Sequence, residues 1–199
     1  MMKTKTALVT GACKNTGVDI VKKFLSEKYR VIFTGRNEKS VSEALERYKS
    51  EYPDCDVTGI TINSLNADAS VDEKSVTDMF LRFDKENIFV DTLVLNAADQ
   101  GLNMKIFENP LIDFMRVINT NMLWNFCICQ EAAKRMKENG GGSITFINSN
   151  TAYRVIPDRI AYRASKSGQL GMMRALAFDL GKYNIRVNAV LPGMIKTDR

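Results

Sequence analysis

The sequence contains no histidine at all, and this single absence removes several kinds of functional site. A zinc or haem site built on imidazole ligands is excluded, and so is catalysis by a histidine general base. We therefore predict no metal site. Any acid or base catalyst in this chain has to be a tyrosine, a lysine, a cysteine or a carboxylate.

Cysteines and long apolar runs are also scarce. The four cysteines include no CxxC pair, and reduced thiols in a cytoplasmic protein are their simplest interpretation. No stretch approaches the roughly 20 apolar residues of a membrane span. The short segment before residue 10 has no apolar run long enough for a signal peptide. We expect a cytoplasmic protein without a membrane partner.

Acidic residues are slightly outnumbered, with 23 Asp and Glu against 28 Lys and Arg, for a net charge of +5. This mild excess favours an anionic ligand. The basic residues are scattered, however, and no basic run is interleaved with aromatic residues, so we expect no nucleic-acid partner.

Six short apolar runs rich in β-branched residues alternate with helical patterns along one domain of residues 1–199. Several runs are apolar at nearly every position, as in strands of a parallel sheet buried on both faces. The predicted strands lie within residues 6–11, 30–35, 57–63, 91–97, 143–149 and 185–193.

The segments between the runs carry apolar residues at helical spacing. Val76, Met79, Phe80 and Phe83 form one such stripe, and longer helices are predicted for residues 111–138 and 161–182. The alternation predicts an α/β fold, a doubly wound parallel sheet with helices on both faces, in which the chain ends after the sixth strand. Ligands of such sheets bind beyond the carboxyl ends of the strands.

The segment "TGACKNTG", residues 10–17, follows the first predicted strand and opens the first helix. Backbone N–H groups at such a helix start favour a pyrophosphate. At the end of the second strand, a carboxylate would bind an adenosine 2′-hydroxyl, but this chain has Gly35 followed by Arg36. Arg36 and Lys14 can instead hold a 2′-phosphate, which predicts NADP(H) in preference to NAD(H). The alternative is that both cations are merely solvated.

Tyr162 and Lys166 lie four residues apart at the start of a predicted helix, so both face the same way. A nearby ammonium stabilises a phenolate and makes proton exchange with an alcohol or carbonyl practical. Ser149, at the end of the fifth strand, can donate to the same substrate oxygen. An isolated YxxxK usually marks a helix surface, whereas YxxxK preceded by this serine is specific.

Together these motifs resemble the short-chain dehydrogenase/reductase family, in its single-domain form similar to 3-oxoacyl-[acyl-carrier-protein] reductases. The resemblance covers residues 6–199 and implies a Rossmann-like fold. "LNAA", residues 95–98, resembles the family's NNAG segment, and "LPGMIKT", residues 191–197, resembles the segment beside the nicotinamide. Asn121 matches the asparagine of the catalytic tetrad.

The resemblance implies a role for each tetrad member. Tyr162 is the acid/base, Lys166 also binds the nicotinamide ribose, Ser149 polarises the carbonyl, and Asn121 supports a water relay to the lysine. The strand ends and the resemblance together place the cofactor contacts at Gly11, Cys13, Lys14, Asn15, Thr16, Gly17, Arg36, Asn37, Asp68, Ala69, Asn96, Ala97, Ala98, Tyr162, Lys166, Pro192, Gly193, Ile195 and Thr197.

Three departures from the family pattern stand out. Asn15 replaces the middle glycine of the cofactor loop. Because asparagine tolerates positive φ better than most residues, we expect an altered but working loop. Leu95 and Ala98 replace Asn and Gly in the fourth-strand motif. The sequence also stops where the family continues into a lid and a last strand, so both are expected to be absent.

We therefore expect an NADPH-dependent oxidoreductase that moves a hydride between nicotinamide and a small-molecule carbonyl or alcohol substrate. The alternative is a non-catalytic dinucleotide-binding sensor or scaffold that kept the fold. The helices at 111–138 and 161–182 carry more apolar residues than one sheet face covers. In the family these helices pack against symmetry mates, so we expect a homo-oligomer, a dimer or tetramer.

Overall fold

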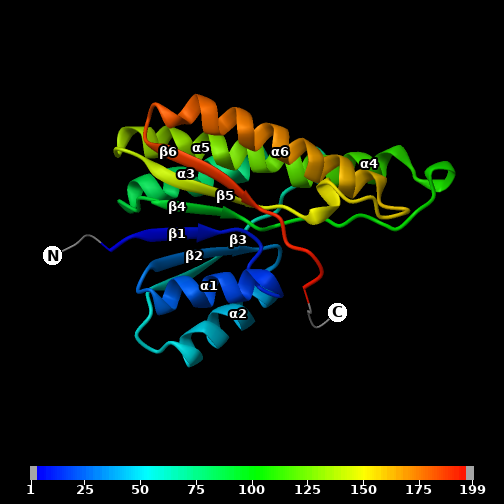
Figure 1. Ribbon diagram of the computed structural model, residues 1–199. Coiled ribbons are helices and arrows are strands. Elements are labelled where there is room, and N and C mark those ends of the chain that lie inside the picture. Colours follow the sequence, from blue (N-terminus) through cyan, green and yellow to red (C-terminus); the bar gives the residue numbers. More distant parts are fainter. Residues whose placement is uncertain (1–3, 196–199) are drawn as a thin grey trace.

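The computed structural model describes residues 4–195, which contain one six-stranded parallel sheet (Figure 1). The strand order is β3-β2-β1-β4-β5-β6, so the chain starts in the middle of the sheet and moves outward twice, as predicted. The strands are β1 (Thr6–Val9), β2 (Arg30–Gly35), β3 (Val57–Thr61), β4 (Thr92–Leu95), β5 (Gly142–Ile147) and β6 (Ile185–Val190).

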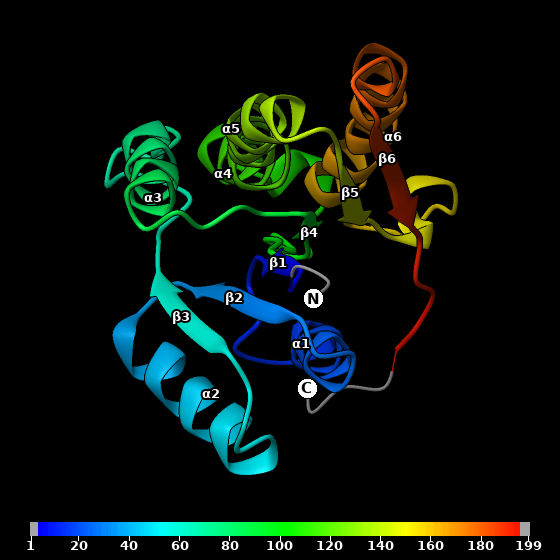
Figure 2. The same ribbon diagram turned by 90° about the vertical axis from the view of Figure 1, so that its left-hand side faces the viewer.

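Helices cover both faces of the sheet (Figure 2). One layer consists of α1 (Thr16–Ser26) and α2 (Glu38–Glu51). The opposite layer consists of α3 (Glu73–Lys85), α4 (Leu111–Ile118), α5 (Trp124–Glu138) and α6 (Ile160–Gly181). Two short 3-10 turns, η1 (Ile106–Glu108) and η3 (Asn150–Ala152), lie in the connections. No helix within residues 4–195 has the length and apolar character that crossing a bilayer requires.

Each helical layer has its own apolar core against the sheet. On the α1 and α2 side, Phe33 and Tyr48 pack edge to face with ring centroids 5.1 Å apart. On the other side, the predicted α3 stripe is buried, and Phe80 and Phe83 pack edge to face at 5.5 Å. Burial of strands on both faces explains why their sequences are apolar at nearly every position.

The predicted helix over residues 111–138 is interrupted by a π-helical turn, η2 (Asn119–Leu123), between α4 and α5. The wider turn gives the Asn121 carbonyl two side-chain donors, Asn125 Nδ2 at 2.8 Å and Gln169 Nε2 at 2.6 Å. Single π turns of this kind occur frequently at functional sites. Apolar spacing alone does not reveal the extra residue in the turn.

The carboxyl ends of β1 and β4 are held together at the centre of the sheet, where the strand order reverses. The Thr10 hydroxyl accepts hydrogen bonds from the backbone N–H groups of Asn96 and Ala97, each at 3.0 Å. Asn96 Nδ2 donates to the carbonyls of Thr10 and Gly11 at 3.0 and 2.9 Å. These contacts fix the loop after β1 against the end of β4, where a ligand of a doubly wound sheet binds.

Candidate active site

The loop of residues 10–17 depends on two glycines. Gly11 has φ +65°, and a Cβ there would lie 2.7 Å from the Cα of Ala97. A Cβ at Gly17 would lie 2.7 Å from both the Cα of Ala12 and Nδ2 of Asn96. The loop therefore packs tightly against β4 and leads directly into α1, so that the N-terminus of this helix faces the pocket.

Asn15 adopts a positive φ, as predicted, but in a more demanding conformation than the left-handed helical one. Its angles are φ 54° and ψ −146°, in a region that is almost restricted to glycine. Such a conformation costs about 1–3 kcal/mol and is kept only where the surroundings enforce it. The Asn15 carbonyl accepts from the N–H of Val18 at 2.9 Å, which starts α1. The loop geometry therefore tolerates the substitution at the expense of local strain.

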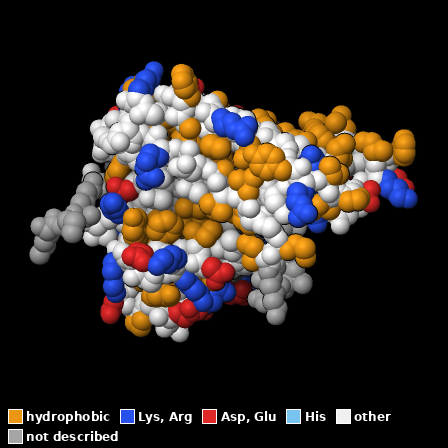
Figure 3. Space-filling model, viewed as in Figure 1, with side chains coloured by type: hydrophobic (Ala, Val, Ile, Leu, Met, Phe, Trp, Pro, Cys, Tyr) orange, Lys and Arg blue, Asp and Glu red, His pale blue; other side chains and the backbone are white. Residues whose placement is uncertain are grey.

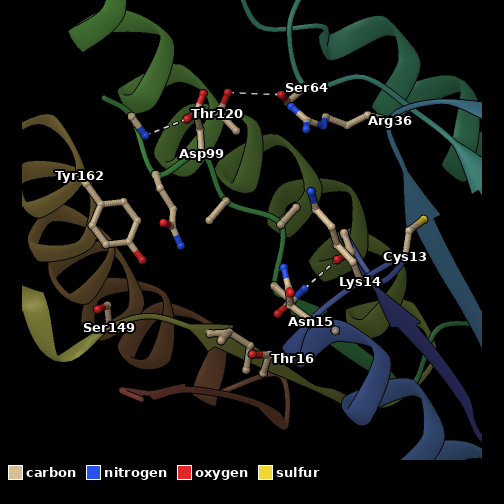
Figure 4. Close-up of a pocket in the computed structure, with 18 of the residues that line it drawn as sticks. Cys13, Lys14, Asn15, Thr16, Arg36, Ser64, Asp99, Thr120, Ser149 and Tyr162 are labelled. Atoms are coloured by element: carbon tan, nitrogen blue, oxygen red, sulfur yellow. Dashed lines mark hydrogen bonds between the residues drawn. The ribbon is translucent and has the colours of Figure 1, made fainter. Parts of the chain in front are cut away.

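The pocket extends along the carboxyl ends of the strands and contains almost all of the predicted cofactor residues (Figure 4). Those that line it are Gly11, Cys13, Lys14, Asn15, Thr16, Gly17, Arg36, Asn37, Asn96, Ala97, Ala98, Tyr162, Lys166, Pro192, Gly193 and Ile195. Thr197 lies outside the described residues.

Asp68 and Ala69 do not line this pocket, so their contact with the cofactor stays a prediction. The chain reverses between Leu65 and Val71, and this carries Asp68 to the tip of an exposed turn. There its carboxylate accepts from the N–H and hydroxyl of Ser70, and these hydrogen bonds lower the pKa of Asp68. Residues 63–65 line the pocket in their place.

Lys14 and Arg36 approach the same end of the pocket from the loop after β1 and from the end of β2 (Figure 4). A third cation that the sequence did not indicate, Arg47 of α2, lines the same end. Its Nη2 donates to the Cys13 carbonyl at 3.0 Å. Asn37 also caps α2, accepting from the N–H of Ser40 at 2.9 Å.

Gly35 leaves no room for the carboxylate that would bind a free ribose 2′-hydroxyl. It is buried, and a Cβ there would lie 2.3 Å from Cys13 Sγ and 2.7 Å from a methyl group of Val41. An acidic residue at this position would require both neighbours to move. Close packing around Gly35 therefore keeps an acidic side chain out of position 35 at this end of the pocket, where Lys14, Arg36 and Arg47 lie.

Three members of the predicted tetrad meet at the opposite end of the pocket. Ser149 and Tyr162 point their hydroxyls toward the same space (Figure 4). Nζ of Lys166 lies 5.7 Å from the centroid of the Tyr162 ring and donates to the Ile147 carbonyl at 2.9 Å. Lys166 is only 1% exposed, and its burial lowers the pKa of the ammonium to about 8.

The Ser149 hydroxyl has its acceptor positions occupied. Its Oγ accepts from the N–H of Thr151 at 3.2 Å and from the Thr151 hydroxyl at 2.9 Å. A serine hydroxyl has two lone pairs and one hydrogen, so the hydrogen of Ser149 is left to donate into the pocket. This polarity suits a residue that polarises a carbonyl oxygen.

Asn121, the fourth member, is fully buried behind the pocket wall. Its Nδ2 donates to the Ser165 hydroxyl at 2.9 Å, and its carbonyl accepts from Gln169. The side-chain carbonyl of Gln169 in turn accepts from Asn148 Nδ2 at 3.1 Å. Asn148 Nδ2 also donates to the Lys166 backbone carbonyl at 2.9 Å. Asn121 thus joins a buried polar network that positions the turn of α6 carrying Lys166.

A family model described as short chain dehydrogenase matches residues 5–199 of this chain. The chain belongs to the short-chain dehydrogenase family. It is 37% identical over 199 residues to a 3alpha-hydroxysteroid dehydrogenase of Mediterraneibacter gnavus. The aligned region covers 100% of this chain and 76% of that protein.

Solved structures agree with this assignment. ElxO with NADP bound matches with a TM-score of 0.88 and 28% identity, covering 98% of this chain and 76% of that one. A 4-hydroxyisoleucine dehydrogenase complexed with NADH matches with a TM-score of 0.85 and 27% identity, covering 98% and 75%. This short-chain dehydrogenase is an NAD(P)-dependent oxidoreductase.

The residues of the pocket fit a dinucleotide. The tight turns at Gly11 and Gly17 allow the loop backbone to approach a pyrophosphate at the N-terminus of α1. From this central point the pocket reaches Arg36 on one side and Tyr162 and Lys166 on the other. An elongated ligand can therefore contact cations at one end and the tetrad at the other.

The low pKa of Lys166 predicts a specific pH dependence of stability. Between about pH 8 and 10.5 the folded protein has lost the Lys166 proton that the unfolded chain still binds. Because the unfolded state binds more protons there, the free energy of unfolding should rise with pH. Relative to Lys166→Met, the parent should gain on the order of 3 kcal/mol across this window. Urea unfolding at several pH values measures the difference.

The matched control is Lys85→Met, which removes an exposed lysine from the end of α3. Its unfolding free energy should stay parallel to that of the parent from pH 7 to pH 10. If the Lys166→Met curve is equally parallel, the ammonium is not destabilised by burial and the assignment is wrong.

Proposed function

We propose that this enzyme is an NADPH-dependent reductase, or the reverse dehydrogenase, of a carbonyl/alcohol pair, with Tyr162 as acid/base. The observation that carries the proposal is the arrangement of a buried ammonium, a phenol and a donating serine hydroxyl at one end of a dinucleotide-sized pocket. Tyr162 is only 9% exposed, so proton exchange there takes place largely away from bulk water.

Each side chain has a distinct part in the reaction. The Ser149 O–H donates to the substrate oxygen and holds it beside the Tyr162 hydroxyl. Tyr162 gives its proton to that oxygen during reduction and takes it back during oxidation. The Lys166 ammonium stabilises the phenolate that is left. When bound, the nicotinamide supplies or accepts the hydride.

Tyr162→Phe should abolish turnover while leaving NADPH binding almost unchanged. The substitution removes only the proton-transfer group, which contributes about 10²–10⁴-fold to the rate. NADPH oxidation is measured with a panel of aldehydes, ketones and 3-oxoacyl thioesters, and cofactor affinity by fluorescence titration. Near-parental kcat in Tyr162→Phe would falsify the acid/base role. Cofactor binding without turnover by the parent would favour the non-catalytic sensor or scaffold instead.

The preference for NADPH is supported by the cations at the adenosine end of the pocket. Lys14 and Arg36 line it from two neighbouring strand ends, and the packing around Gly35 excludes a competing carboxylate. Charge-assisted hydrogen bonds to a 2′-phosphate suit this arrangement. The bound NADP of the similar ElxO is further support.

Arg36→Ala should weaken NADPH binding by roughly tenfold to a hundredfold and leave NADH binding unchanged. One charge-assisted hydrogen bond contributes about 1.5–3 kcal/mol, which corresponds to that range. Dissociation constants for both cofactors are compared in the parent, Arg36→Ala and the surface control Lys39→Ala. An equal loss for NADPH and NADH would show that Arg36 does not recognise the phosphate.

We also propose a homo-oligomer, a dimer or tetramer, built on α4, α5 and α6. Large apolar side chains gather on the face that α4 and α6 share (Figure 3). Phe178 of α6 is 87% exposed, and an apolar groove lined by Phe126 and Leu180 lies between α5 and α6. An apolar surface of this kind is typical of a protein–protein interface.

Sedimentation velocity at micromolar concentration should therefore give a dimer or tetramer. Phe178→Asp should shift the enzyme toward the monomer, because it places a charge in the apolar contact. The exposed substitution Lys182→Asp, at the end of the same helix, serves as the control. A parent enzyme that sediments only as a monomer removes the proposal.

A further inference from the structure

The pocket carries more cationic than acidic side chains, and the partners of the cations differ. Within residues 4–195, the acidic side chains that line it are Glu43 and Asp99. The cationic side chains that line it are Lys14, Arg36, Arg47, Arg116, Arg159 and Lys166. Three of the cations, Arg116, Arg159 and Lys166, lie toward the tetrad end, away from the positions that the 2′-phosphate and the pyrophosphate would take.

At the tetrad end, two of the cations are already engaged by the protein. Arg116 forms ion pairs with Asp99 and, at 3.6 Å, with Asp113. The carboxylate of Asp99 also accepts from the N–H of Gly101 at 2.8 Å. The charge of Arg116 is therefore neutralised within the protein. Lys166 is buried and bonded to the Ile147 carbonyl.

Arg159 is different. It precedes α6, is partly buried in the pocket wall, and lies three residues before Tyr162. Its Cζ is 5.8 Å from the centroid of the Tyr162 ring. Among the described residues no carboxylate lies within ion-pair distance of its guanidinium. The side chain therefore presents a positive charge without an ion-pair partner in the pocket wall, beside the ring of Tyr162.

We propose that Arg159 binds an anionic group of the substrate, so that the enzyme acts on keto acids or the corresponding hydroxy acids. A guanidinium matches a carboxylate with two parallel hydrogen bonds, which gives both affinity and orientation. Because Arg159 and Tyr162 are adjacent, the carboxylate lies within a few bonds of the reacting carbonyl. The inference rests on the proposed function and specifies its substrate.

The reaction consumes the keto acid, NADPH and one proton, which the Tyr162 phenolate takes up from water after each reduction. In the reductive direction the hydride forms a C–H bond at the carbonyl carbon, the C=O π bond breaks, and Tyr162 delivers a proton to oxygen. The keto acid is reduced to a hydroxy acid and NADPH is oxidised to NADP⁺. The carboxylate keeps its charge throughout, so its contact with Arg159 serves positioning and affinity.

The first test compares acids with their neutral esters in the whole chain. The substrates are 2-oxobutanoate, 3-oxobutanoate and 4-oxopentanoate, in which zero, one and two methylenes separate the carbonyl from the carboxylate, each with its methyl ester. The parent should prefer at least one acid over its ester by roughly tenfold to a hundredfold in kcat/KM. Equal or better use of every ester overturns the proposal.

The second test uses Arg159→Met and Arg159→Lys. Methionine keeps an unbranched side chain that can pack on Tyr162, whereas lysine keeps the charge but loses the two-pronged geometry. For the preferred acid, Arg159→Met should lose about tenfold to a hundredfold in kcat/KM, mainly through KM, and Arg159→Lys should recover part of it. The ester should change by less than about twofold. Arg154→Met, an exposed arginine outside the pocket, is the control.

The outcomes distinguish a failure of the substrate assignment from a failure of the proposed function. Equal losses for acid and ester would mean that Arg159 acts on Tyr162 or the cofactor, and would overturn the substrate assignment while leaving the reductase intact. If no carbonyl compound is reduced, the proposed function fails by itself. Calorimetric titration of 3-oxobutanoate into the NADP⁺ complex then decides the binding role: weaker binding by Arg159→Met supports it, and equal binding by parent and variant rejects it.

Discussion

The burial of one ammonium group is the constraint on which the rest of the site depends. Lys166 is almost completely enclosed, and its ammonium lies 5.7 Å from the centroid of the Tyr162 ring. A buried charge is costly unless it is hydrogen-bonded. The Ile147 carbonyl at the end of β5 supplies such a bond, so the position of Lys166 is set by the last residue of an interior strand.

A buried network fixes the helix that carries this lysine. Asn148 and Gln169 bond to each other and connect the end of β5 to α6, while Gln169 also reaches the carbonyl of Asn121. That carbonyl can take side-chain donors because it lies in the π-helical turn. Fully satisfied networks of this kind rigidify a core. The unusual turn in η2, the tetrad asparagine and the orientation of Lys166 are thus parts of one arrangement.

Local spacing predicted those parts of the site that depend on a few neighbouring residues. Tyr162 and Lys166 share a helix face, and Ser149 ends a strand, so the sequence alone indicated them. Asp68 and Ala69 do not line the pocket, because the chain reverses after β3, and apolar pattern does not distinguish such a turn from a longer strand end. Arg47 and Gln169 were missed for a different reason: each acts on backbone that is distant in sequence, and only the packed fold brings them there.

The end of the pocket near β2 is shaped by close packing of the same kind. The cofactor loop lies so near the end of β2 that Cys13 occupies the space of any side chain at position 35. Arg36 is the first residue of this strand end that can extend into the pocket, and Arg47 stabilises the loop from α2 through the Cys13 carbonyl. Introducing an acidic residue at Gly35 would therefore disturb the loop as well as the charge. An acidic residue at position 35 therefore requires a change at Cys13 as well, because packing couples the two positions.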